Sequence, residues 1–79
     1  MNTTPYTISI APAARRQLSL FPQKTRKFIF KYLEALAINP RPPGVKKIEG
    51  MTGLYSQQID GARIIFKVED QEVLLLLVK

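Results

Sequence analysis

The sequence predicts an α+β fold, with two helices in the N-terminal half packed on one face of a mostly antiparallel sheet. Three observations support this class. Residues 23–38 have helical apolar spacing, Asp60-Gly61 has the chemistry of a hairpin turn, and strand-like segments lie on both sides of that turn. The predicted order is β-α-α-β-β-β-β, within a single domain that spans residues 1–79.

Two helices are expected in the first half. Pro12 suits the first turn of a short helix, which the Phe21-Pro22 pair ends. Residues 23–38 form the clearest helix, and Asn39-Pro40 ends it. Its predicted buried stripe has the spacing i, i+1, i+4, i+5, i+8 and comprises Phe28, Ile29, Tyr32, Leu33 and Leu36. Its predicted lysine face comprises Lys24, Lys27 and Lys31.

Strands account for most of the remaining chain. The expected strands are residues 6–10, 45–48, 54–59, 62–68 and 72–78. Strand 62–68 should place Ile64, Phe66 and Val68 on one face, because strand side chains alternate. Strand 72–78 is apolar on both faces, which is typical of an interior strand.

The composition excludes several kinds of site. The chain has no cysteine and no histidine, so a disulfide, a thiolate nucleophile and an imidazole metal ligand or base are excluded, and no metal or cofactor is expected. Its longest apolar run, Val73–Val78, is too short to span a bilayer. The first ten residues lack the pattern of a signal peptide, so we expect a cytoplasmic protein.

The charge is unevenly distributed along the chain. The net charge is +6, but the residues up to Lys47 contain nine basic side chains and one acid, Glu34. From Ile48 onward there are three basic and five acidic side chains. A solvated helical surface explains this pattern. A surface that binds a polyanion, such as RNA, DNA or an acidic protein, explains it equally well.

The most informative segment is residues 42–68, which read PPGVKKIEGMTGLYSQQIDGARIIFKV. A proline-glycine loop leads into a basic stretch, a glycine turn, a strand that begins Leu54-Tyr55, and a hairpin. This order resembles the RelE/ParE superfamily, the small toxins of prokaryotic type II toxin–antitoxin modules. The resemblance extends over nearly the whole chain, and its specificity lies in the order and spacing of the elements.

The resemblance implies a site on this hairpin. RNA-cleaving members follow the strand tyrosine with alternating basic residues, where this chain has Ser56 and Gln58. Arg63 matches the family's catalytic arginine, although Ala62 replaces the preceding aromatic residue. Members usually continue into a segment that supplies another arginine and a late tyrosine or histidine, and this chain stops at Lys79. We therefore expect Arg63 to stabilise charge, with Ser56 and Gln58 on its face unless they point into the helices.

Other residues are candidates for binding. The candidate nucleic-acid-binding residues are Lys46, Lys47 and Lys67, for which a role as solvated surface lysines is the alternative. Tyr55 is expected to pack in the core on the side of the helices. Leu75 and Leu77 are expected to form an exposed apolar patch that binds the antitoxin.

The resemblance implies a toxin neutralised by a cognate antitoxin. The first hypothesis for its activity is ribosome-dependent cleavage of mRNA, weakened by the missing basic residues. One alternative is a ParE-like inhibitor of DNA gyrase, which needs no catalytic residues. Another is a catalytically inactive member that acts only as an antitoxin-binding partner or co-repressor. The expected partners are therefore the antitoxin and the ribosome with its mRNA, or else gyrase, with no membrane and no metal.

Overall fold

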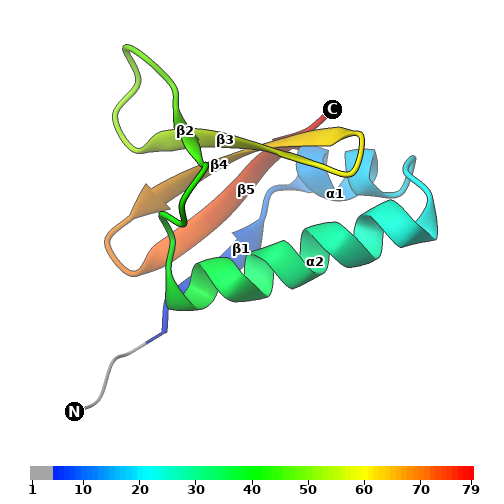
Figure 1. Cartoon of the computed structure of the whole chain (residues 1–79), viewed down its shortest axis with the longest axis horizontal. Helices are drawn as coiled ribbons and strands as arrows, with labels where there is room; N and C mark the ends of the chain where they lie inside the picture. The colour runs from blue at the N-terminus through cyan, green and yellow to red at the C-terminus, as the bar shows by residue number, and fades with distance from the viewer. Residues whose placement is uncertain (1–4) are drawn as a thin grey trace.

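The computed structural model describes residues 5–79, and its elements follow the predicted order (Figure 1). The strands are β1 (Thr7–Ile10), β2 (Lys46–Lys47), β3 (Leu54–Ile59), β4 (Ala62–Glu69) and β5 (Glu72–Val78). The helices are α1 (Pro12–Leu18) and α2 (Gln23–Ile38). The predicted α+β class and the predicted element order are confirmed.

The five strands form one sheet in the order β1-β5-β4-β3-β2. β1 runs parallel to β5, whereas the other three neighbouring pairs are antiparallel. The single parallel pair arises because β1 is connected to the rest of the sheet through the two helices. β5 lies between β1 and β4, which explains why its sequence is apolar on both faces.

Both helices contribute to one core on one face of the sheet. The helical core residues are Ala14, Leu18, Ile29, Leu33 and Leu36. The sheet contributes Ala62, Ile64, Phe66, Val68, Val73, Leu75 and Val78. Figure 1 shows α2 lying across this face of the sheet. We call this side the covered face and the opposite side the open face, because no helix of residues 5–79 packs on it.

The β4 strand shows the predicted alternation. Ile64 and Phe66 are fully buried on the covered face, whereas Arg63 is exposed and Ile65 and Lys67 are half-buried on the open face. The Asp60-Gly61 turn fixes the pairing of β3 with β4. The side chain of each β3 residue therefore lies on the same face of the sheet as that of its β4 partner.

A bulge overturns one sequence expectation on β5. Phe66 pairs with Leu75, but its neighbour Ile65 pairs with Leu77, so Leu76 is an additional residue in β5. This extra residue shifts the alternation and places Leu75 and Leu77 on opposite faces. Leu75 is fully buried in the core and Leu77 is half-buried. The expectation that these two leucines form an exposed patch is therefore wrong.

The buried stripe of α2 also differs from the expected one. Ile29, Leu33 and Leu36 are buried as predicted, but Phe28 is 44% exposed. The polar Thr25 occupies the buried stripe instead, with its hydroxyl donating to Asp60 Oδ2 at 3.0 Å. This hydrogen bond joins the first turn of α2 to the β3–β4 turn and satisfies the buried hydroxyl.

Candidate functional site

A small hollow lies on the open face where β2, β3 and β4 are neighbours. It has a volume of about 80 Å³ and is lined by Gly44, Lys46, Ser56, Gln57, Gln58 and Arg63, of which Gln57 pairs with Ile64 of the covered face. We call it the sheet hollow. The pairing of the strands explains the cluster, since Lys46 lies opposite Ser56 and Gln58 lies opposite Arg63. Four side chains from three strands thus meet at one place.

Two turns bring these strands together. Gly61 has a φ of +82°, which glycine adopts without strain, and the tight turn that it completes places Gln58 beside Arg63. Gly44 has a φ of +91° and ends the loop that delivers β2 to the edge of the sheet. The two-residue length of β2 leaves Lys46 as its single residue on the open face.

The sheet hollow is electropositive. Lys46 and Arg63 are exposed, and no acidic side chain lines the hollow. Within residues 5–79 the one ion pair joins Lys67 to Glu69, so neither cation of the hollow is neutralised by a salt bridge. Ser56 is only 8% exposed, whereas Gln58 is exposed. The expectation that Ser56 and Gln58 share the face of Arg63 is confirmed by the pairing of β3 with β4.

Lys67 lies outside the sheet hollow. It is on the same face as Arg63 but four residues further along β4, which corresponds to about 13 Å at the rise of a strand. Its Nζ is 3.1 Å from Glu69 Oε1, and the side chain of Lys67 is 41% exposed. The structure therefore does not bring Lys67 together with Arg63, and Glu69 offsets its charge.

Lys47 lies on the other face of the sheet from Lys46. It pairs with Tyr55, whose ring stacks on Phe66 with centroids 5.8 Å apart. Tyr55 thus packs against the core, as predicted, and points away from the sheet hollow. Its hydroxyl oxygen accepts a 2.9 Å hydrogen bond from Arg41 Nε, which raises the pKa of Arg41 above its ordinary value. The two adjacent lysines of β2 cannot serve one site.

These side chains can bind an anion but offer little for proton transfer. Lys46 and Arg63 can neutralise phosphate charge, and the amide of Gln58 can donate a hydrogen bond. Cleavage of RNA through its 2′-hydroxyl also needs a base and an acid. Ser56 and Gln58, which also line the hollow, are neutral and supply neither a charged base nor a charged acid.

Sequence reasoning missed part of this geometry. Gly44 lines the hollow but was not among the predicted site residues. The sequence feature that could have indicated it is the proline-glycine loop that precedes β2. The separation of Lys46 from Lys47 follows from strand alternation, but the short β2 segment gave no pattern long enough to set its register. The partnership of Arg41 with Tyr55 had no sequence signal, because the two residues are joined only by the tertiary fold.

Two features are absent from residues 5–79 as a whole, a membrane-spanning helix and a metal-binding cluster. No helix in this part of the chain has both the length and the apolar character that a bilayer span requires. Nor does this part hold a group of three or more acidic side chains arranged as metal ligands, and histidine and cysteine do not occur in the sequence.

Solved structures of known proteins share this fold. No protein-family model matches the chain, and no curated protein matches its sequence. The archaeal RelE–RelB complex from Pyrococcus horikoshii matches with a TM-score of 0.85 and 24% identity, over 98% of this chain and 94% of that one. The Staphylococcus aureus YoeB dimer matches with a TM-score of 0.81 and 24% identity, over 95% of each chain.

The isolated RelE toxin of Escherichia coli is a third match. Its TM-score is 0.81 and its identity is 22%, over 92% of this chain and 81% of that chain. At identities this low the comparisons establish the fold. The chain therefore has the RelE-like fold that residues 42–68 predicted, and the resemblance is confirmed at that level.

Proposed function

We propose that this protein is the toxin of a type II toxin–antitoxin module and that it engages RNA through the sheet hollow. The fold supports the first part, because the proteins of similar structure include RelE toxins alone and in complex with RelB. One observation supports the proposal that the sheet hollow engages RNA. Lys46 and Arg63 converge on the open face with no acidic neighbour in the hollow, an arrangement suited to a phosphate backbone.

Cleavage by this site is expected to be weak. In this proposal Arg63, which lines the hollow, stabilises the charge that develops on a phosphate during attack by the 2′-hydroxyl. Ser56 and Gln58 carry no charge, so they supply neither a second stabilising cation nor an efficient proton-transfer group. The proposed activity is thus slow ribosome-dependent cleavage of mRNA that depends on Arg63.

Inducible expression with primer extension on a translated mRNA tests this proposal. Wild-type protein should slow growth and produce cleavage products, and Arg63→Ala should reduce the cleavage rate by about 10²–10³-fold. Lys67→Ala is the matched control, because Lys67 lies on the same strand and face but outside the hollow, and it should keep most of the activity.

Three outcomes would contradict the proposal. Cleavage that survives Arg63→Ala would show that the site lies elsewhere. Growth arrest with intact mRNA and blocked DNA supercoiling would point to gyrase as the target. Absence of any arrest, combined with stable binding of an antitoxin, would identify a protein that acts only through that complex.

A further inference from the structure

The residue that follows β5 lies directly beside Arg63. The backbone N–H of Arg63 donates to the carbonyl oxygen of Lys79 at 2.9 Å, and the N–H of Lys79 donates to the carbonyl oxygen of Arg63 at 2.8 Å. Two reciprocal bonds of this kind join an opposed antiparallel pair, whose Cα atoms are about 5.5 Å apart. Opposed side chains lie on the same face of a sheet, so the exposed Lys79 is a neighbour of Arg63 on the open face. Figure 1 shows this end of the chain, marked C, near the β3–β4 turn.

The bulge in β5 determines the face on which Lys79 lies. Without the additional Leu76, regular alternation along the strand would point Lys79 towards the core. With the bulge, Val78 pairs with Ile64 in the core, and Lys79 follows on the open face opposite Arg63. Bulges are over-represented next to active sites, where they redirect a side chain. The irregularity of β5 therefore adds a positive charge to the open face.

The backbone before Lys79 is held from both sides. On the β4 side are the two hydrogen bonds to Arg63. On the other side the N–H of Val78 donates a 2.6 Å hydrogen bond to Oε1 of Gln17, a residue of α1. The helix thus fixes the end of β5, and the exposed side chain of Lys79 extends from a defined position beside Arg63.

Two cations at opposed positions are unfavourable unless an anion lies between them, because like charges directly opposite each other destabilise a sheet. Within residues 5–79 neither Arg63 nor Lys79 forms an ion pair. The acid closest to Arg63 in the sequence is Asp60, whose carboxylate accepts a hydrogen bond from the buried Thr25 on the covered face. Glu69 lies six residues along β4 from Arg63, which corresponds to about 20 Å. The pair is therefore open to an external anion.

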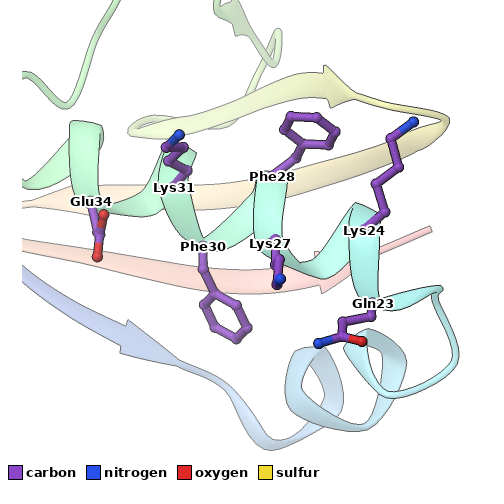
Figure 2. Close-up of a pocket in the computed structure, with 7 residues that line it drawn as sticks. All are labelled: Gln23, Lys24, Lys27, Phe28, Phe30, Lys31 and Glu34. Carbon is purple, nitrogen blue, oxygen red and sulfur yellow. The ribbon is translucent and has the colours of Figure 1, made fainter.

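The lysines of α2 lack this convergence. Lys24, Lys27 and Lys31 occur on the helix, and Figure 2 shows their side chains leaving it in different directions. The first and the last are seven residues apart, which corresponds to about 10 Å along the helix axis. They contribute to the general positive field of the molecule, whereas Arg63 and Lys79 are close enough to bind the same anion.

We propose that Arg63 and Lys79 form a clamp that holds one phosphate of a single-stranded RNA. Lys79 then supplies the second positive charge that the neutral Ser56 and Gln58 do not supply. Gln58 is the β3 partner of Arg63, and Lys79 is its partner beyond β5, so the clamp extends the sheet hollow across β4. This assignment rests on the proposed function, because it adds a residue to the same site. Lys79 binds phosphate charge and transfers no proton.

Fluorescence anisotropy with labelled hexauridylate tests the clamp on the full chain. Lys79→Gln should weaken binding about two- to fivefold at low salt, because the contact of one exposed cation is lost. The loss should shrink as salt is raised. Lys79→Arg keeps the charge and should restore the affinity to within about twofold of the wild type. Thermal denaturation should give the same melting temperature for these variants and the wild type, which separates lost binding from lost folding.

Lys67→Gln is the matched control. Lys67 is also a lysine of the open face, but it is paired with Glu69 and lies outside the sheet hollow, so its substitution should leave the affinity unchanged. In the primer-extension assay Lys79→Gln should reduce the cleavage rate about tenfold, because negative charge on the phosphate increases in the transition state, and Lys79→Arg should restore cleavage.

The outcomes distinguish failure of the clamp from failure of the proposed function. If Arg63→Ala weakens binding of hexauridylate but Lys79→Gln behaves like Lys67→Gln, the clamp is wrong and the sheet hollow stands. If neither Arg63→Ala nor Lys79→Gln changes binding, both proposals are wrong. Failure of Lys79→Arg to restore binding would also overturn the clamp. A DNA duplex that binds more tightly than hexauridylate, with the same dependence on Lys79, would assign the clamp to DNA and contradict its RNA partner.

Discussion

The two faces of the β3–β4 hairpin are built by the same strands, yet they are subject to different constraints. On the covered face, Ile64 and Phe66 are fully buried and pack against the helices. On the open face, Arg63 is exposed and no helix of residues 5–79 restricts what it contacts. One strand can therefore contribute both to the core and to a binding site, because its successive side chains point to opposite faces of the sheet. Substitutions on one face then affect packing, and substitutions on the other face affect binding.

The largest expected difference between the two faces comes from removing the aromatic ring of Phe66 from the core. Phe66→Ala should lower the free energy of unfolding by about 3–5 kcal/mol, since Phe66 is fully buried and the collapse around the cavity is incomplete. Arg63→Ala, on the same strand but on the open face, should change it by less than about 0.5 kcal/mol. Urea denaturation followed by circular dichroism measures both, and similar losses for the two variants would contradict the division between the faces.

A second test compares the two altered positions within the open face. Ser56→Lys should cost about 1–3 kcal/mol, because Ser56 is 8% exposed and an ammonium placed there loses hydration. Gln58→Lys should cost less than about 0.5 kcal/mol and should steepen the salt dependence of RNA binding by about 0.7 in log–log slope. Melting temperatures and RNA affinities at two salt concentrations measure these effects. Equal destabilisation by both lysines would mean that Gln58 is not free to face the solvent.

A third test concerns the one polar residue in the α2 stripe. Thr25→Val removes the hydroxyl that donates to Asp60 and should lower the free energy of unfolding by about 1 kcal/mol. Thr7→Val, at an exposed position of β1, should change it by less than about 0.5 kcal/mol and provides the control. If thermal denaturation shows no difference between them, the hydrogen bond between α2 and the β3–β4 turn contributes nothing to stability.

The sequence predicted the fold through its periodic segments. Strand alternation in residues 62–68 placed Ile64 and Phe66 correctly, and the Asp60-Gly61 turn set the hairpin. Two failures have a common cause. Neither the extra Leu76 in β5 nor the burial of Thr25 in place of Phe28 can be recognised without the partner element, because a bulge and a buried hydrogen bond are tertiary features.

The candidate site was predicted less completely. Arg63, Ser56 and Gln58 came from the resemblance and the hairpin pattern, and the structure places them on one face. Lys46 and Lys47 were proposed together, but only the first lies in the sheet hollow. A strand of two residues has no readable periodicity, so its register is set by the edge of β3 rather than by its own sequence.

Substitution of the two adjacent lysines of β2 tests most directly whether the open face is the nucleic-acid-binding face. Affinity for a single-stranded RNA should be measured across a range of salt concentrations. Lys46→Ala should reduce the log–log slope by about 0.7, since one phosphate contact is lost, and Lys47→Ala should leave it unchanged because Lys47 faces the other way. An equal or larger reduction for Lys47→Ala would contradict the account.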